Sequence, residues 1–382
     1  MNQSDQQNYL GSYQRRRMLR AGMGSIAATA AGGIFGSRVA LAEPIGPKVP
    51  EVDRLAVRIV TDSYHHAFER STKIGALEIQ RFGFSVSKEP PKRTLQNEWG
   101  LAWHIESQIG AETKQVLFDF AYTSETLLNN MLLLGIDPSK IDAIALSHGH
   151  YDHFGGMNGF LEATRGKLRN GLPFYMGGEE CFCTRELNVP GNPGNFGALD
   201  REAIKKAGLV VTFSKGPSLL ASHGFTPGFI PAEGFEKVLS PTRMSVGMQG
   251  ALGCDPSKVN PEKKSVTNVP DDFEHELSAV YHVKGRGLVI MTSCGHRGIV
   301  NTVRAATKAS GVSKVHAIMG GFHLAPHAPE YLKQTVDSLK QFNPDFLIPM
   351  HCSGEGFISM AATEFGPKFI RSSTGSRFVF AA

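Results

Sequence analysis

The stretch ALSHGHYDHFGGMNG, residues 145–159, places three histidines and one aspartate within six residues, directly before a glycine pair. It overlaps IDAIALS (141–147), an apolar run typical of a buried strand. His148 therefore stands where a predicted strand ends and a loop begins. Gly155 and Gly156 allow close backbone packing before the next predicted helix.

The chemistry of this stretch predicts a metal site. Neutral imidazole and carboxylate are ligands of zinc and of similar divalent ions. The spacing allows two ions side by side, one bound by His148 and His150 and the other by Asp152 and His153. A surface histidine cluster is the alternative, which the dense pattern at the end of a buried strand disfavours. We expect two zinc ions, with iron or manganese as the other candidates.

Later strand ends supply the further ligands that two ions need. His296 comes shortly after GLVIMTS (287–293), His323 after KVHAIMG (314–320) and His351 after DFLIPM (345–350). Each histidine thus follows an apolar strand and precedes a predicted helix, as His148 does. We expect all of them at one edge of the sheet, with His296 completing the first ligand set and His351 the second.

The remaining pattern predicts an α/β sandwich of mixed sheets with helices outside, formed by residues 55–382. Residues 177–275 are rich in Gly and Pro and poorly periodic, which predicts a loop-rich insertion. Further strands are predicted at 55–63, 101–107, 115–121, 277–283 and 376–382, and helices at 124–134, 154–164, 199–208, 299–309 and 329–341.

Residues 1–42 are predicted to be a signal peptide. Arg15 and Arg16 precede an Ala/Gly-rich apolar run that ends in ALA, and the arginine pair resembles a twin-arginine signal. We expect the twin-arginine translocation machinery as a partner, cleavage after Ala42, a periplasmic or otherwise exported mature protein, and no stable membrane association after cleavage. An uncleaved membrane anchor is the alternative. Residues 43–54, which contain three prolines, form a predicted linker.

Charge and cysteine content limit the partners. The formal net charge is +5, and five arginines and one aspartate in the predicted signal peptide account for +4 of it. The rest of the chain is nearly neutral, which argues against nucleic-acid binding. We expect a small-molecule substrate. The five cysteines are an odd number, so at least one stays free or binds something.

The motif H-x-H-x-D-H followed by G-G, with later histidines at successive strand ends, resembles the metallo-β-lactamase superfamily. That resemblance implies an αββα sandwich with a metal site along one edge. EWGLAWHIE (98–106), SCGHRGIVN (293–301), GGFHL (320–324) and PMHCSG (349–354) resemble the branch of dihydropterin-ribofuranosylaminobenzene-phosphate synthase-like metallo-hydrolases. The resemblance covers about residues 55–381.

Two departures from the superfamily pattern concern the site. The usual D-T-G is DFA at 119–121, which keeps Asp119. The aspartate that usually bridges the two ions is missing, because GGFH stands in its place and leaves His323 or a water there. We therefore expect one tight and one weak metal site, since a single carboxylate, Asp152, balances two dications poorly.

The predicted activity is hydrolysis by a metal-activated water. Asp152 and His323 are the candidate catalytic residues, and Arg297 is a candidate for binding an anionic substrate such as a phosphoester. Four residues are expected beside the ligands: Asp119, Glu98, Cys294 and Cys352; either thiol can approach the ions, although buried thiols near the site are favoured. The alternatives are a di-iron redox enzyme, against which the lack of a flavin domain argues, and a non-catalytic metal- or partner-binding protein. The substrate itself is not predicted.

Overall fold

The computed structural model describes residues 39–83, 90–188, 191, 194–239, 241–264 and 268–382. Most of the predicted signal peptide, residues 1–38, lies outside the described residues. Within the described part of the chain, no helix combines the length and the apolar character needed to cross a membrane.

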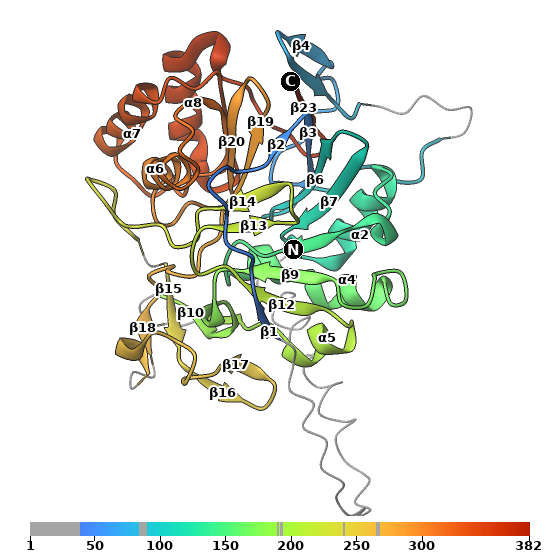
Figure 1. Ribbon diagram of the computed structural model, residues 1–382, viewed down its shortest axis with the longest axis vertical. Helices are drawn as coiled ribbons and strands as arrows, with labels where there is room; N and C mark the ends of the chain where they lie inside the picture. Colours follow the sequence, from blue (N-terminus) through green and yellow to red (C-terminus); the bar gives the residue numbers. More distant parts are fainter. Residues whose placement is uncertain (1–38, 84–89, 189–190, 192–193, 240, 265–267) are drawn as a thin grey trace, which may run out of the picture. The chain divides into compact units, whose positions relative to one another are not determined.

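The first sheet has ten strands in the order β1-β12-β9-β8-β7-β6-β3-β23-β5-β4 (Figure 1). Neighbours from β1 to β7 are parallel, and those from β7 to β4 are antiparallel. The strands are β1 (Val39–Leu41), β3 (Arg54–Thr61), β4 (Thr72–Ile74), β5 (Leu77–Gln80), β6 (Ala102–Ile109), β7 (Glu112–Phe118), β8 (Ala143–Ala145), β9 (Pro173–Met176), β12 (Val210–Phe213) and β23 (Arg377–Ala381).

The second sheet has seven strands in the order β13-β14-β19-β20-β21-β22, with β2 paired to β19. Strands β20, β21 and β22 are parallel to one another. Its strands are β2 (Glu51–Val52), β13 (Ser218–Leu220), β14 (Gly224–Thr226), β19 (Ala279–Val283), β20 (Gly287–Thr292), β21 (Val315–Gly321) and β22 (Phe346–Met350). Both large sheets are therefore mixed, as predicted.

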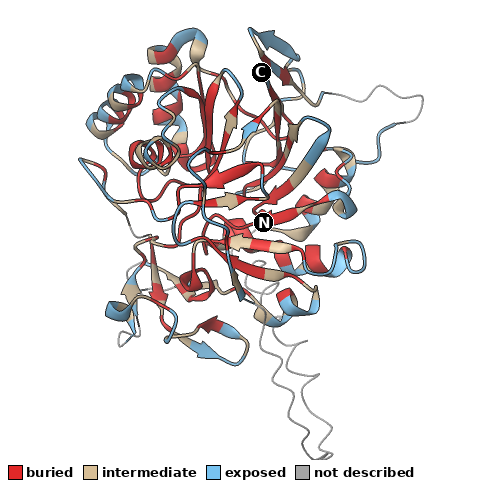
Figure 2. Ribbon diagram, viewed as in Figure 1, coloured by how far each residue is buried: buried red, intermediate tan, exposed pale blue. Residues whose placement is uncertain are grey.

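Helices cover the outer faces of the two sheets. Apolar side chains such as Val57, Trp103, Tyr281 and Met291 form one core between the sheets. A second core packs α2 (Ser124–Leu133), α4 (Met157–Ala163) and α5 (Arg201–Lys206) on the first sheet. A third core packs α6 (Ile299–Ser310), α7 (Pro329–Gln341) and α8 (Gly354–Phe365) on the second (Figures 1 and 2). This four-layer αββα arrangement confirms the predicted fold class.

The segment 177–275 is distributed over several sheets. Its strand β12 belongs to the first large sheet, and β13 and β14 belong to the second. Its other strands form two small sheets, one with β11 (Gly194–Gly197), β10 (Thr184–Leu187), β15 (Thr242–Ser245) and β18 (Val269–Pro270), the other with β16 (Gly247–Gln249) and β17 (Leu252–Cys254). A disulfide joins Cys183 to Cys254 within this segment.

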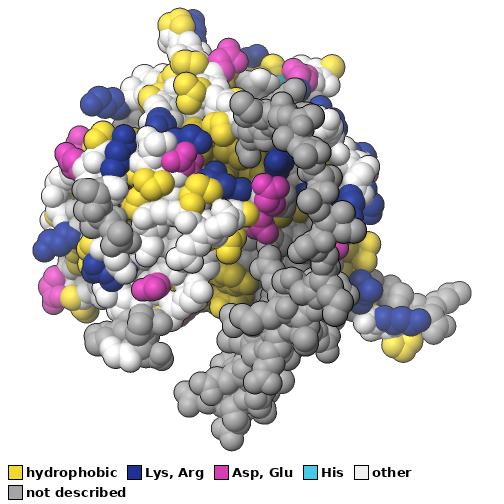
Figure 3. Space-filling model, turned by 90° about the horizontal axis from the view of Figure 1, so that it is seen from below, with side chains coloured by type: hydrophobic (Ala, Val, Ile, Leu, Met, Phe, Trp, Pro, Cys, Tyr) yellow, Lys and Arg dark blue, Asp and Glu magenta, His cyan; other side chains and the backbone are white. Residues whose placement is uncertain are grey.

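Short helices complete the structure. They are α3 (Tyr151–Phe154) and the 3-10 helices η1 (Pro138–Lys140), η2 (Glu179–Phe182), η3 (Pro261–Lys263), η4 (His351–Ser353) and η5 (Gly366–Lys368). On the face shown in Figure 3, basic side chains are interspersed with acidic and apolar ones. That distribution agrees with the near-neutral charge of the chain after residue 42.

Candidate metal centre

The predicted ligands come together at the carboxyl ends of four strands. Because β7 and β8 are parallel, as are β20, β21 and β22, the loops after these strands open toward the same edge of the sandwich. His148 and His150 follow β8, Asp152 and His153 lie in α3, His296 precedes α6, His323 follows β21, and His351 follows β22.

Two groups of three ligand residues form within this cluster. His148, His150 and His296 present ligand atoms within 4.8 Å of one another, and so do Asp152, His153 and His351. All six side chains are buried. The distance from Oδ2 of Asp152 is 3.6 Å to Nε2 of His153 and 3.4 Å to Nε2 of His351. The structure thus places each predicted set of three in position to bind one ion.

Several donor atoms in the cluster have no hydrogen-bond partner among the described residues. They include Nε2 of His148 and both ring nitrogens of His296. A buried polar atom without a partner costs roughly 1–3 kcal/mol. Divalent ions would coordinate these atoms, so the residues fit the metal ions that the sequence predicts.

The protonation states of the first group, His148, His150 and His296, also suit metal binding. Burial and the nearby imidazoles of His153 and His150 lower the pKa of His148 well below its usual range. Burial lowers the pKa of His150 to about 3, and burial together with His323 lowers that of His296 strongly. These imidazoles are therefore neutral at pH 7, which is the form that binds a metal.

Asp152 is ionised in the same environment. Burial by itself would raise the pKa of Asp152, but His153 and His351 outweigh burial and lower that pKa well below its usual range. Burial by itself would lower the pKa of His351, but the carboxylates of Asp152 at 3.4 Å and Asp62 at 3.7 Å outweigh it and raise that pKa well above its usual range. The second group thus pairs a carboxylate with two imidazole rings whose pKa is raised, and a metal ion would displace their protons.

Asp119 orients the ring of His153 by a contact on the side away from the ligand cluster. It lies at the end of β7 with φ 64°, and its Oδ2 is 2.8 Å from Nδ1 of His153. The same carboxylate accepts hydrogen bonds from the backbone N–H of Ser147 at 2.7 Å and from its hydroxyl at 2.8 Å. A carboxylate on Nδ1 leaves Nε2 of His153 facing the cluster, as in carboxylate–histidine–metal arrangements.

The backbone around His296 is fixed by residues that the sequence analysis missed. Glu276 accepts the N–H groups of His296 at 2.8 Å and Arg297 at 3.0 Å. The ring of Phe273 stacks on that of His296, with centroids 3.7 Å apart and planes 3° apart. Phe273 lies at the end of the poorly periodic segment and Glu276 directly after it, where no pattern marked them.

Arg297 and Glu98 are engaged with the protein itself. The Arg297 side chain is buried and donates from Nε to the carbonyl of Ile230 and from Nη1 to that of Asp272 at 2.7 Å. Glu98 accepts N–H groups at the start of α2, from Tyr122 at 2.8 Å and Thr123 at 2.9 Å. These contacts hold loops, so a role in substrate or metal binding stays a prediction for both residues.

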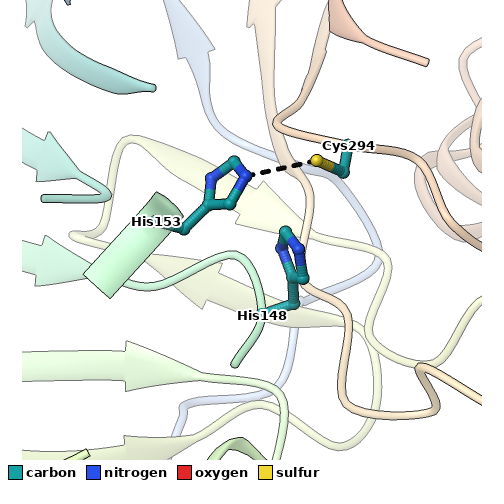
Figure 4. A group of neighbouring side chains, drawn as sticks. All are labelled: His148, His153 and Cys294. Carbon is teal, nitrogen blue, oxygen red and sulfur yellow. Dashed lines mark hydrogen bonds between the residues drawn. The ribbon is translucent and has the colours of Figure 1, made fainter. Parts of the chain in front are cut away.

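His323 and the two thiols lie in the cluster. The ring centroids of His323 and His296 are 4.1 Å apart, and Nδ1 of His323 has no hydrogen-bond partner among the described residues. Cys294 Sγ is 3.2 Å from Nε2 of His153, as Figure 4 shows. Cys352 Sγ is 3.3 Å from Cys294 Sγ and accepts the N–H of His323 at 3.2 Å. The ring of Trp99, an exposed side chain, lies 4.8 Å from that of His351, between centroids.

Comparison with known proteins agrees with this geometry. The model of the metallo-beta-lactamase superfamily matches residues 107–172, which include β8 and the H-x-H-x-D-H motif. A 7,8-dihydropterin-6-methyl-4-(beta-D-ribofuranosyl)-aminobenzene-5'-phosphate synthase of Methanocaldococcus jannaschii is 30% identical over 287 residues, which are 74% of this chain and 90% of the relative. The chain belongs to the metallo-beta-lactamase superfamily. An uncharacterised protein of the same organism is 28% identical over 252 residues, 64% of this chain and 82% of its own length.

Solved structures of the superfamily have the same fold. The crystal structure of Tm1679, a metal-dependent hydrolase of the beta-lactamase superfamily, superposes with a TM-score of 0.60 at 19% identity. The alignment covers 85% of this chain and 98% of Tm1679. At this identity the similarity establishes the superfamily fold for nearly the whole described chain.

Proposed function

We propose that this protein is a metal-dependent hydrolase that acts on a small anionic substrate, such as a phosphoester. The observation that carries the proposal is the buried cluster of six ligand residues with unpartnered donor atoms facing one another. Two divalent ions, with zinc favoured by the imidazole-rich set, would supply acidification of a water and polarisation of the scissile carbonyl or phosphoryl group.

The protein's own residues provide orientation and proton transfer. Oδ2 of Asp152 is close to His153 and His351, while Oδ1 makes no hydrogen bond within the described residues. Oδ1 of Asp152 is therefore free to orient the attacking water. His323 is partly exposed and has an unpartnered Nδ1 beside His296, so it can donate a proton to the leaving group.

Two observations support an anionic substrate. Asp152 is the one carboxylate in the two ligand groups, so two dications there leave positive charge that an anion would offset. The compound in the name of the Methanocaldococcus relative carries a 5′-phosphate. Arg297, whose guanidinium lies 4.7 Å from the ring of Phe229, would contribute positive charge at the start of α6.

We also propose that the mature protein is exported. Support comes from the twin-arginine pattern at Arg15 and Arg16 and from the disulfide between Cys183 and Cys254, since structural disulfides are typical of exported proteins. Cleavage after Ala42 would yield a periplasmic chain without the Ala/Gly-rich run. It would also remove β1, which pairs with β12 at the edge of the first sheet.

The test of the hydrolase proposal starts from purified mature protein. Metal content is measured first, and then turnover of phosphoester, lactone, thioester and β-lactam substrates. We expect up to two divalent ions per chain and turnover of at least one anionic substrate. Metal binding and turnover should both be lost in His148→Ala. A protein that binds no metal, or that turns over substrate equally well in this variant, would refute the proposal.

A further inference from the structure

Cys294 lies between the two groups of ligands. It follows β20, two residues before His296, and its side chain is buried. Its Sγ lies within 4.8 Å of ligand atoms of His148 and His153, which belong to different groups (Figure 4). Both imidazoles point toward the same sulfur. Cys294 is thus adjacent to both proposed ions rather than to one.

Cys294 also lies close to a second residue of each ligand group. Its sulfur forms a further close group with His296 and His323, and another with His351 and Cys352. His296 belongs to the first ligand group and His351 to the second. Cys294 therefore lies close to two members of each ligand group.

The local backbone explains this placement. Gly295 has φ 63°, a conformation that permits the chain to turn sharply between Cys294 and His296. A Cβ on Gly321 would come within 2.2 Å of the carbonyl of Ser293 and 2.9 Å of Cys352 Sγ. The ends of β20 and β21 are therefore packed closely, and the side chain of Cys294 is directed into the centre.

Charge and ligand chemistry favour an anionic ligand at the position of Cys294. The aspartate that usually bridges two ions in this superfamily is missing from GGFH, and Asp152 alone balances two dications poorly. A thiolate is an anionic ligand that zinc binds at about 2.3 Å. The unpartnered nitrogens of His148 and His296 on one side and His351 on the other show that the surroundings of Cys294 are incomplete without ions.

We propose that the Cys294 thiolate bridges the two metal ions, in place of the missing carboxylate. This inference rests on the proposed metal-dependent function. Metal binding displaces the thiol proton to solvent, so the sulfur enters the site as an anion. Cys352, whose Sγ lies 3.3 Å from that of Cys294, remains a thiol that donates a hydrogen bond to the bridging sulfur. The two sites should then bind with similar affinity, contrary to the unequal sites expected from sequence.

The first test uses X-ray absorption of the mature protein loaded with two equivalents of zinc. The variant Cys352→Ser is measured beside the wild type, so that Cys294 is the remaining thiol near the ions. A bridging sulfur is seen by both ions and gives about one sulfur neighbour per zinc at roughly 2.3 Å. A terminal cysteine on one ion gives about half that number, and either that value or no sulfur would overturn the proposal.

The second test follows cobalt(II) binding by near-ultraviolet absorption, where thiolate-to-cobalt charge transfer appears. We expect this band in the wild type, in Cys352→Ser and in the control Cys181→Ser, which alters a buried free thiol that lies against the carbonyl of His275. The band should vanish in Cys294→Ser. Persistence of the band in that variant, or its loss in Cys352→Ser alone, would overturn the bridge.

A carboxylate variant separates ligation from folding. Cys294→Asp should bind two cobalt ions without the charge-transfer band, whereas Cys294→Ser should weaken the second ion by about 10-fold or more. If Cys294→Asp binds the second ion no better than Cys294→Ser, the position does not bridge. A protein that binds two ions and hydrolyses substrate without sulfur ligation would refute this inference and leave the proposed hydrolase intact.

Discussion

The Sγ atoms of Cys294 and Cys352 are 3.3 Å apart in a buried centre, although the two residues are separated by 58 positions in sequence. A disulfide requires an S–S distance of about 2.0 Å, so a small movement would join them. Metal ions bound to Cys294 would prevent this, because the electron pairs of the thiolate that would form the S–S bond are bound to the ions.

We therefore expect metal-dependent protection from oxidation. Metal-free protein treated with diamide should form the Cys294–Cys352 disulfide, whereas protein loaded with zinc should react at least about 10-fold more slowly. Peptide mapping without reduction measures the cross-link. Cys181, a free buried thiol, serves as an internal control and should stay unmodified under both conditions. Equal rates with and without zinc would contradict the expectation.

Loss of a metal ligand should abolish activity and leave the fold intact. His148→Ala and Asp152→Ala each remove a donor from the loops at the sheet edge, while the three apolar cores lie elsewhere. Metal affinity should fall by more than the roughly 10- to 100-fold typical of losing an outer hydrogen-bond partner. Metal analysis and circular dichroism check this outcome, and full activity in either variant would count against the site.

Asp119→Asn should weaken the second metal site without removing a ligand. An amide at this position binds Nδ1 of His153 less strongly than the carboxylate at 2.8 Å, and it no longer fixes the ring tautomer. We expect a 10- to 100-fold loss of metal affinity, of the order seen for such outer partners. Asp137→Asn, at the exposed start of η1, is the matched control. A metal affinity equal to that of the control would show that Asp119 does not position His153.

The ligand cluster could be predicted because strand ends leave a clear pattern. Apolar runs before His148, His296 and His351 predict strands, and the helices after them predict parallel neighbours that end at one edge. The central place of Cys294 could not be predicted, because it depends on the turn at Gly295 and on the close approach of β21. The residues that support His296 were missed for another reason, since they come from a segment without periodicity.

The capping carboxylate of α6 should make stability depend on pH. Burial raises the pKa of Glu236 to about 7, although its carboxylate accepts the N–H groups of Val300 at 3.0 Å and Asn301 at 2.7 Å. The folded pKa lies above the unfolded value, so the folded state binds the proton more tightly. This contribution is complete below the unfolded pKa and is lost as the pH rises through about 7.

The measurement compares urea unfolding at pH 5 and pH 8 in wild type and Glu236→Gln. The wild type should lose on the order of 3 kcal/mol more stability than the variant over this interval. Glu233→Gln, an exposed position three residues away, is the control and should follow the wild type. An identical pH dependence in wild type and Glu236→Gln would contradict the assignment.

Export should depend on the arginine pair. Replacing Arg15 and Arg16 by lysine keeps the charge but removes the guanidinium groups that twin-arginine signals require. We expect the variant to remain in the cytoplasm with its full-length N-terminus, whereas the wild type should reach the periplasm and begin at Glu43. Cell fractionation and N-terminal sequencing decide the outcome. Periplasmic protein in the lysine variant would rule out this route.

Three ionisable residues at the centre have backbone conformations that L-amino acids disfavour. The φ angles are 64° at Asp119, 48° at His323 and 51° at His351. Such conformations cost roughly 1–3 kcal/mol each, and glycine would relieve the strain. Glycine carries neither imidazole nor carboxylate, however, so a substitution that relieves the backbone strain would also remove the group that binds metal or positions a ligand. Laboratory selection for thermal stability alone should therefore favour glycine at His323 and His351. The resulting proteins should be more stable but inactive.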